Sequence, residues 1–407
     1  MSLIRCLHIA NSREAIHHME KVGVDATGLR LMQGKTLHLN LKVEGVDPKT
    51  ANLLKQEMLS LGGDAAVDGR GLDCSAPLTD TLLMGTQKQI EKLISKLEQY
   101  PHLQPLGQSL KETLTHISRR HYVIHCRNQA YTLGKKTLLM GILNVTPDSF
   151  SDGGLYFDKG KAVDQGVRMA GEGADLIDVG GESTRPGSKP VGEEEELRRV
   201  IPVVQALTKN VKVPISIDTS RAGVAQKAVE AGAEIINDIS GLHVDPRLGE
   251  VAAKERTPLV LMHIRGTPET MQKDVRYDSL FSEILHSLRK SVQRAESCGV
   301  EPNQIIVDPG IGFGKNLEHN LLILKNLSEL RVLGKPVLVG TSRKTFIGKI
   351  LHTDVNERLE GTLSTIAIAV LHGAHIIRSH DVLPAKRAIA VADAIKLAGS
   401  GEFRETM

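Results

Sequence analysis

The sequence predicts an α/β protein in which a (β/α)8 barrel, the TIM-barrel architecture, follows a small α/β domain. Eight short apolar runs occur after residue 137, and segments with helical spacing separate them. Eight such units over about 260 residues fit a closed barrel better than an open doubly wound sheet, which usually has fewer strands. Before residue 115 the apolar pattern is shorter and alternates, which indicates a separate domain.

An α/β module of unknown role is expected over residues 1–115. The segment 36–46 alternates apolar and polar residues, which predicts a half-buried strand, and a helix capped by Asp47 follows it. A second strand is expected over 79–85, with a helix that begins after the Thr86 cap. The module has no group of residues of catalytic type, so we expect it to serve as a scaffold or in oligomerisation.

Residues 116–136 are polar and rich in histidine and arginine, and we expect them to link the module to the barrel. The barrel is expected over 137–395, and 396–407 form a C-terminal tail. Continuous apolar strands covered by helices are what a parallel sheet requires. The predicted strands are TLLMGIL, ADLIDVGG, VPISID, EIINDIS, PLVLMHI, QIIVDPG, PVLVG and HIIRS.

Composition limits the classes of partner. The 407 residues are 41% apolar and 24% charged, which is typical of a globular protein with a sizeable core. A net charge of +3 is small for this length, so we expect no nucleic-acid partner. The four cysteines lie far apart, and charged residues interrupt the N-terminal segment before a signal-peptide core can form. We therefore expect a reduced, cytoplasmic setting and no membrane span.

Polar side chains follow every predicted barrel strand. In a parallel barrel all carboxyl ends of the strands open on one face, so these side chains would converge on one pocket. A single polar strand end is more often a helix cap or a turn, but eight in register indicate a site. The residues are Asn144; Asp178 and Glu182; Asp218; Asn237 and Asp238; His263; Asp308; Ser342, Arg343 and Lys344; Arg378 and His380.

The chemistry of these side chains predicts the ligand. Asp218, Asp308 and Asn237 offer acceptors for a flat heterocycle that presents adjacent N–H and amino donors. An anion-binding end is expected after the last two strands, where barrels commonly bind phosphate. Its residues are Lys344, Arg378 and His380. The sequence therefore predicts a pocket for a phosphorylated heterocycle.

Two long loops and one glycine-rich turn have alternative interpretations. Residues 141–154 and 180–190 are rich in Gly, Ser and Pro, as is typical of lids, although the second could be a surface turn before an acidic helix start. The segment PGIGFGK matches neither a Walker loop nor a dinucleotide fingerprint, so we interpret it as a tight turn displaying Phe313 and Lys315. The 16 histidines form no metal-binding pattern.

Seven motifs, in order, resemble those of the dihydropteroate synthase family. They are NVTPDSFSDGG, DVGGESTRPG, SIDT, INDISG, DPGIGFGK, GTSRK and RSHDV. The resemblance spans residues 137 to 395. It implies a (β/α)8 barrel that condenses 6-hydroxymethyl-7,8-dihydropterin diphosphate with 4-aminobenzoate and releases diphosphate. It also implies that Mg2+ is the cofactor and that the protein is usually a homodimer.

The resemblance also implies roles for single residues. Asp308, Asn237 and Asp218 would hold the pterin edge, and Lys344 would reach its carbonyl side and border the aminobenzoate site. Asn144 would contact Mg2+. The diphosphate would be held by Thr184, Arg378 and His380. The pocket for aminobenzoate, where sulfonamides compete in this family, would be shaped by Phe150, Thr184, Arg185, Pro186, Phe313 and Ser342. The catalytic set would be Asn144, Arg185, Lys344, Arg378 and His380.

Two departures from the family pattern concern strand ends. MHIRG replaces the frequent MHMQG, so Arg265 adds a cation after the fifth strand and could alter loop packing or substrate affinity. Ser379 replaces a frequent valine, but it alternates away from the pocket.

Two competing functions are open at this point. A corrinoid-linked methyltransferase would also bind a pterin, yet it would not need the STRPG loop or the GTSRK anion site. A pterin-binding regulatory protein would not need to keep the diphosphate-binding and loop residues together.

Overall fold

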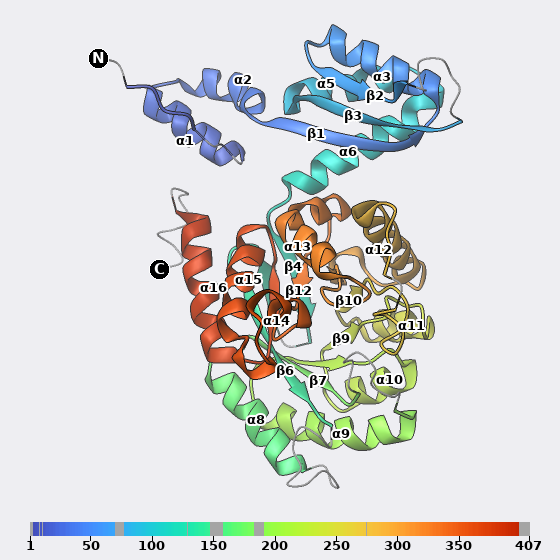
Figure 1. Cartoon of the computed structure of the whole chain (residues 1–407), viewed down its shortest axis with the longest axis vertical. Coiled ribbons are helices and arrows are strands. Elements are labelled where there is room, and N and C mark those ends of the chain that lie inside the picture. Colours follow the sequence, from blue (N-terminus) through green and yellow to red (C-terminus); the bar gives the residue numbers. More distant parts are fainter. Residues whose placement is uncertain are drawn as a thin grey trace. The chain divides into compact units, whose positions relative to one another are not determined.

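The computed structural model divides into two compact units, formed mainly by residues 1–115 and 116–398. The larger unit is a barrel of parallel strands surrounded by helices (Figure 1). No helix in the described part of the chain is both long and apolar enough to cross a membrane. The structure describes residues 3–7, 9, 11–69, 77–127, 129–146, 158–182, 191–273 and 275–398.

All eight predicted barrel strands are present. They are β6 (Leu138–Asn144), β7 (Leu176–Gly180), β8 (Ile215–Asp218), β9 (Ile235–Asp238), β10 (Leu259–Met262), β11 (Ile305–Asp308), β12 (Leu338–Val339) and β13 (Ile376–Ser379). Their order is β11-β10-β9-β8-β7-β6-β13-β12, and a parallel bridge between Val307 and Val337 joins the two ends of this series. Because each strand therefore lies beside its neighbour in the sequence, the sheet closes, and the predicted TIM-barrel fold is confirmed.

Helices cover the outside of the barrel. They are α8 (Lys159–Gly171), α9 (Glu193–Asn210), α10 (Ala222–Glu230), α11 (Arg247–Glu255), α12 (Leu280–Ser297), α13 (Leu317–Lys325), α14 (Thr345–Leu351), α15 (Leu359–Leu371) and α16 (Val382–Leu397), with the short 3-10 turns η2 (Pro302–Gln304), η3 (Leu327–Leu333) and η4 (Val355–Glu357). Outward-facing strand residues such as Leu143, Val179 and Ile217 pack against them in one apolar core. Burial on both faces explains why the strands are continuous apolar runs.

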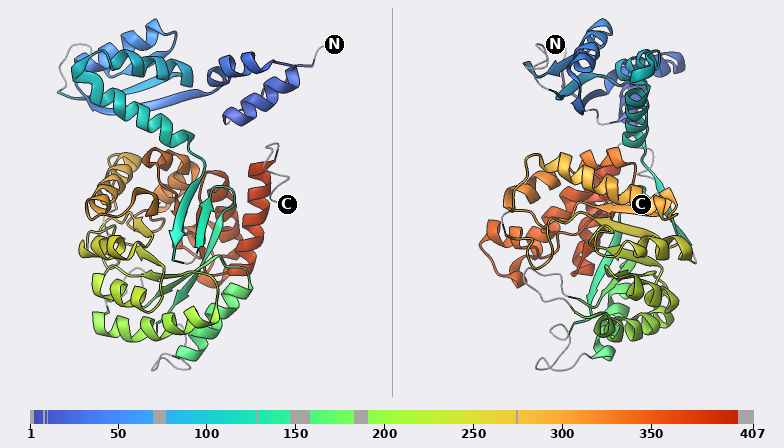
Figure 2. Two further views of the ribbon diagram at one scale, coloured as in Figure 1. Left: turned by 180° about the vertical axis from the view of Figure 1, so that it is seen from behind. Right: turned by 90° about the vertical axis from the view of Figure 1, so that its right-hand side faces the viewer.

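A β-hairpin packs against the amino-terminal end of the barrel (Figure 2). Its strands are β4 (Tyr122–Cys126) and β5 (Gln129–Leu133). Tyr122 and Ile124 are buried against Leu176 and Ile376, the first residues of two barrel strands. The hairpin is also tied to η2, since the Gln304 amide donates to the His125 carbonyl oxygen at 2.8 Å and accepts from its N–H at 2.9 Å.

The expected linker, residues 116–136, therefore contains a hairpin that packs on the barrel. Its polar composition hid a five-residue strand in which only alternate side chains are buried. An alternation over only five residues is too short to distinguish a strand from a polar loop in the sequence.

The N-terminal unit contains the predicted strands and helices together with elements that were not expected. Its elements are α1 (Ser12–Val22), α2 (Ala26–Thr36), β1 (His38–Val46), α3 (Pro48–Ser60), β2 (Asp64–Val67), β3 (Thr79–Thr86), α5 (Gln87–Leu97), η1 (Pro101–Leu103) and α6 (Gln104–Ser118). The antiparallel order is β1-β3-β2. The caps are as predicted: Asp47 accepts from the Lys49 and Thr50 N–H groups, and Thr86 forms a capping box with Gln89.

Candidate active site at the carboxyl ends of the barrel strands

The carboxyl ends of the barrel strands surround a cavity of about 780 Å³, a volume suited to a small-molecule ligand. The predicted site residues in its wall are Asn144, Asn237, Asp308, Phe313, Ser342, Lys344, Arg378 and His380. Asp218 lies beside this wall, because its carboxylate accepts a hydrogen bond from Arg378. Phe150, Thr184, Arg185 and Pro186 lie outside the described residues, so their roles stay predictions.

Asp308 is a fixed acceptor at the end of β11. It is 7% exposed, and its Oδ1 accepts a hydrogen bond from the Gly310 N–H at 2.6 Å. That turn requires glycine: Gly310 has a φ of 69°, and a Cβ there would lie 2.0 Å from the His263 carbonyl oxygen. Burial raises the pKa of Asp308 to about 6, although the Gly310 N–H and nearby Lys344 oppose the rise. Above this pH the carboxylate is a charged acceptor at the cavity wall.

Arg378 binds two buried carboxylates. Its Nε donates to Asp178 Oδ2 at 2.6 Å, and its Nη2 donates to Asp218 Oδ2 at 2.6 Å. Asn237 also donates to Asp178 Oδ2, at 2.9 Å. Arg378 belongs to the predicted anion-binding end of the pocket and Asp218 to the predicted acceptor end. The two ends are therefore in direct contact rather than on opposite sides of the pocket. Burial raises the pKa of Asp218 to about 7, and Arg378 limits that rise.

His380 differs from the cation that the sequence predicts. Its Nδ1 lies 3.0 Å from Ser342 Oγ, and its backbone N–H donates to the same oxygen at 3.2 Å. Burial, together with the positive charge of Arg378, lowers the pKa of His380 to about 3, so the ring is neutral near pH 7. The histidine thus offers a neutral hydrogen-bonding group, a property set by three-dimensional burial.

Lys344 follows β12 and lies over an aromatic ring. Its Nζ is 4.0 Å from the centroid of the Phe313 ring, a cation–π contact. Burial lowers the pKa of Lys344 to about 8. The preceding residue, Arg343, has a φ of 55°, and its guanidinium donates to Asp381 at 2.6 Å rather than lying against Phe313.

Comparison with known proteins agrees with this site. Residues 140–380 match the family model of pterin-binding enzymes. A dihydropteroate synthase from Synechocystis sp. is 50% identical over 263 residues, which cover 64% of this chain and 91% of that protein. The chain belongs to the dihydropteroate synthase family. It is accordingly an enzyme, a transferase of folate biosynthesis that acts on small-molecule substrates.

Two further comparisons differ in how much of this chain they cover. The structure of the Yersinia pestis dihydropteroate synthase with a sulfonamide drug superposes with a TM-score of 0.65 at 43% identity, and the match covers 68% of this chain and all of that one. A probable bifunctional folylpolyglutamate synthase/dihydropteroate synthase from Haloferax volcanii is 36% identical over 398 residues, or 95% of this chain and 46% of that protein. The similarity to the Haloferax synthase therefore includes most of the N-terminal unit.

Arg265, a departure from the synthase pattern, acts on loop packing. Its Nη1 donates to Glu283 Oε2 at 2.7 Å, and its guanidinium lies 4.7 Å from the centroid of the Tyr277 ring. It is absent from the described wall of the cavity. Tyr277 in turn donates from its hydroxyl to the Gly314 carbonyl oxygen at 2.9 Å. Of the two effects expected for Arg265, the contacts favour the one on loop packing.

Asp178 and Arg221 are two residues whose roles in the synthase site the sequence did not reveal. The sequence predicts Asp178 as a polar strand end, but its bonds to Asn237 and Arg378 depend on how the barrel closes. Arg221, after β8, is not among the residues that the sequence predicts for the site. It donates to Glu182 Oε2 at 2.9 Å, to the buried Glu196 and to the Val191 carbonyl oxygen at 2.6 Å.

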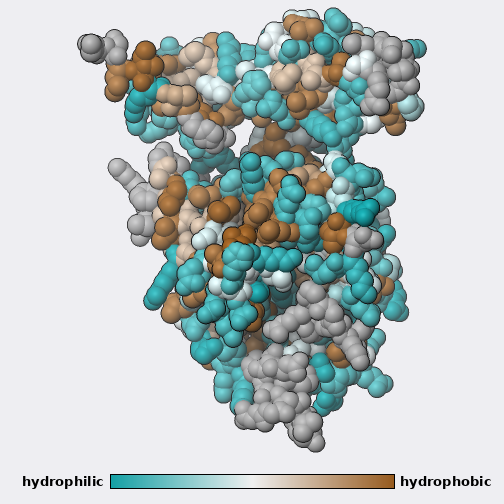
Figure 3. Space-filling view, viewed as in Figure 1, coloured by the Kyte–Doolittle hydropathy of each residue, from teal (hydrophilic) through white to brown (hydrophobic). Residues whose placement is uncertain are grey.

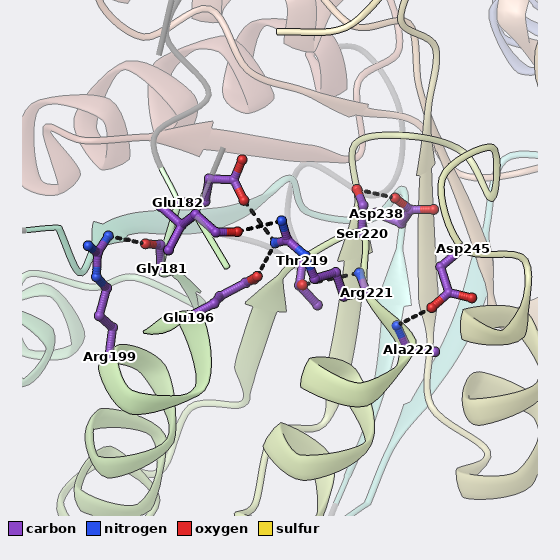
Figure 4. Close-up of polar contacts among 11 residues, drawn as sticks. Gly181, Glu182, Glu196, Arg199, Thr219, Ser220, Arg221, Ala222, Asp238 and Asp245 are labelled. Atoms are coloured by element: carbon purple, nitrogen blue, oxygen red, sulfur yellow. Dashed lines mark hydrogen bonds and ion pairs between the residues drawn. The ribbon is translucent and has the colours of Figure 1, made fainter. Parts of the chain in front are cut away.

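Arg221 therefore holds residues that flank positions 183–190 on both sides. Figure 4 shows its guanidinium between Glu182 and Glu196, with Arg199 bonded to the carbonyl oxygen of Gly181 nearby. Glu196 is 1% exposed, and burial raises its pKa while Arg221 opposes the rise. A buried carboxylate of this kind depends on its counter-charge.

Changing Arg221 to Met is expected to lower the midpoint of thermal unfolding by roughly 5–10 °C, because it leaves Glu196 as a buried charge without its partner. The folded-state pKa of Glu196 is raised, so the loss should grow as the pH increases and the carboxyl ionises. Arg247→Met is the matched control, since Arg247 is 76% exposed in its pair with Asp245. Equal melting temperatures for the two variants would contradict the prediction.

Proposed function

We propose that the cavity binds 6-hydroxymethyl-7,8-dihydropterin diphosphate and 4-aminobenzoate together and joins them to 7,8-dihydropteroate, releasing diphosphate. The observation that carries this assignment is the buried carboxylate of Asp308, held by Gly310 at the wall of a cavity that also contains Lys344 and Arg378. A pterin edge offers N–H and amino donors to the carboxylate, and the diphosphate requires cationic groups.

The pterin ring lies against the acceptor residues. Asp308 accepts from its ring N–H and amino groups, and each charge-assisted bond contributes about 1.5–3 kcal/mol. Asn237 and Asp218 complete the edge, while Lys344 donates to the carbonyl side of the pterin. Without substrate, Asp218 accepts a hydrogen bond from Arg378. A pterin donor that binds Asp218, or a diphosphate oxygen that binds Arg378, therefore replaces this contact.

The diphosphate lies toward Arg378 and His380, with Thr184 as a further predicted contact. Ser342 Oγ accepts from the His380 backbone N–H, so its own O–H can donate to Nδ1. That arrangement leaves the Nε2–H of His380 to donate to a phosphate oxygen. Arg378 supplies positive charge where negative charge develops on the leaving group.

Asn144 would hold Mg2+ together with the substrate. Its carboxamide is in the cavity wall, and the described residues contain no group of three or more His, Cys, Asp or Glu that could hold a metal by themselves. This donor set fits Mg2+, which is commonly bound by few protein oxygens, several waters and substrate phosphates. When bound, Mg2+ would stabilise negative charge on the diphosphate oxygens.

The aminobenzoate lies beside Phe313, Ser342 and Lys344, with Phe150, Arg185 and Pro186 as predicted neighbours. Its amine nitrogen forms the new C–N bond to the pterin methylene carbon as the C–O bond to diphosphate breaks. The amine then releases one proton to solvent, and no strong general base is required. Sulfonamides compete for this part of the cavity, as the drug complex of the Yersinia protein suggests.

A product assay tests the proposed function. The full-length chain is mixed with dihydropterin diphosphate, 4-aminobenzoate and Mg2+, and dihydropteroate and diphosphate are measured. We expect the two products in equal amounts, only with both substrates present, and a stop on adding EDTA that excess Mg2+ reverses. Pterin binding without dihydropteroate formation would overturn the proposal. The expected cytoplasmic location stays a prediction.

The barrel unit has an apolar surface over α15 and α16, and we propose that a homodimer forms through this surface. Apolar side chains gather over these helices (Figure 3). The groove between them, of about 470 Å³, is lined on α16 by Pro384, Ala388, Val391 and Ile395, whose spacing makes one outward stripe. Val391 and Ile395 are 61% and 60% exposed. A second copy with the same stripe can cover it about a two-fold axis.

Changing both Val391 and Ile395 to Glu is expected to convert a dimer into a monomer, because facing carboxylates repel and lose water on association. Light scattering coupled to size-exclusion chromatography measures the mass. Val167→Glu on α8 is the control, since this valine is 41% exposed elsewhere on the barrel. A dimer that persists in the double variant would place the interface on another surface.

A further inference from the structure

Lys315 is a buried lysine that the proposed chemistry does not use, and burial lowers its pKa to about 7. It is 2% exposed, although it lies among the residues that line the cavity. Its ammonium donates to His263 Nδ1 at 2.9 Å, to the Phe313 carbonyl oxygen at 2.9 Å and, more weakly, to the His263 carbonyl oxygen at 3.3 Å. An ammonium has three N–H donors, so this set of acceptors satisfies it completely.

The acceptors of Lys315 come from two different parts of the barrel. His263 follows β10, whereas Phe313 is in the turn between β11 and α13. His263 accepts through Nδ1 and is therefore not protonated there, in keeping with a pKa that burial lowers to about 2. Burial of an ammonium costs several kcal/mol, which an apolar side chain filling the same space would not incur. Simple packing is therefore a poor explanation of Lys315.

The turn that Lys315 fastens is rich in glycine. Gly310, Gly312 and Gly314 all have positive φ values, between 65° and 83°, so the turn has little conformational preference of its own. Phe313, between two of these glycines, packs against Met262 and Met271 and carries Lys344 over its ring. The position of Phe313 thus depends on contacts from outside the turn.

We propose that Lys315, through its bonds to His263 and to the Phe313 carbonyl oxygen, is a positioning residue that fixes Phe313 at the aminobenzoate end of the cavity. The role rests on the proposed function, in which Phe313 borders 4-aminobenzoate. Lys315 does not touch the reacting atoms. Asp308 has its own tie to Gly310, so its position does not depend on Lys315, although Lys315 helps, after the Gly310 N–H and Lys344, to hold the pKa of Asp308 down.

The test compares the two substrates in full-length Lys315→Met. We expect the KM for 4-aminobenzoate to rise about tenfold, since a displaced wall weakens positioning, while the KM for dihydropterin diphosphate stays within about twofold. His263→Leu keeps both carbonyl acceptors and should give a smaller rise of the same kind. The double variant should be no worse than Lys315→Met, because the two side chains act through one bond.

A matched control and the contrary outcomes complete the test. Lys325→Met makes the same change on the exposed face of α13 and should leave both KM values unchanged. Equal rises in both KM values, or additive effects in the double variant, would overturn the positioning role. If Lys315→Met does not fold, His263→Leu and its effect on the two KM values decide the question. Wild-type protein that makes no dihydropteroate would instead overturn the proposed function.

Discussion

Replacing Asp308 with asparagine is expected to lower kcat/KM for dihydropterin diphosphate by about 10²–10⁴-fold. The carboxylate accepts from the Gly310 N–H through one oxygen, and in the proposed function the other would accept from the pterin. An amide at this position offers an NH2 group where one acceptor was required, so a pterin donor would face another donor. Steady-state kinetics with 4-aminobenzoate saturating, and calorimetry of pterin binding, measure the loss.

Low pH should lower the kcat/KM of the wild type for the same reason that Asp308→Asn does. The carboxyls of Asp308 and Asp218, with pKa values of about 6 and 7, lose acceptor capacity as they take up protons, so kcat/KM should fall as the pH drops below about 7. Asp164→Asn, which alters an exposed carboxylate on α8, is the control and should keep wild-type kinetics. Wild-type pterin affinity in Asp308→Asn would mean that another group anchors the pterin.

Replacing Arg378 with methionine is expected to lower kcat by about 10³-fold, because charge on the departing diphosphate loses its guanidinium partner. The change also leaves Asp178 and Asp218 without their counter-charge in the barrel interior. The pKa of Asp218, raised to about 7 even beside Arg378, should rise further, and the variant should lose stability as the pH increases through that value. Single-turnover kinetics and thermal unfolding at pH 6 and 8 measure the two effects.

Two comparisons separate these effects. Arg378→Lys keeps the charge but cannot reach both carboxylates in the same planar geometry, so we expect it to lose less kcat than methionine yet to remain below the wild type. Arg289→Met, on the exposed face of α12, should behave like the wild type. Full activity in Arg378→Met with reduced stability would assign the arginine to structure alone.

The barrel could be predicted because buried parallel strands have a simple sequence pattern. Runs such as ADLIDVGG and QIIVDPG are continuous, since both faces of each strand are covered. The hairpin β4–β5 and the strand β2 escaped prediction because each is only four or five residues long and partly exposed. Short elements of this kind are defined by what they pack against.

Much of the site could also be predicted, since polar residues at the ends of parallel strands must converge. The partners of those residues could not. Arg378 and Asp178 are 200 positions apart, and their ion pair follows from the closure of the barrel. The neutral state of His380 and the burial of Lys315 follow from the depth of these side chains in the fold, which residue type alone does not determine.

The hairpin at the amino-terminal end of the barrel also determines where this chain can be divided. Tyr122, Ile124 and Leu133 cover an apolar layer that would otherwise face water. A fragment that begins at the first barrel strand would expose this layer to water. A fusion joined at the first barrel strand would likewise remove the hairpin that covers the amino-terminal end of the barrel. A barrel fragment that keeps this layer buried therefore begins before the hairpin, and a domain fused on the amino-terminal side of the barrel is best joined upstream of it.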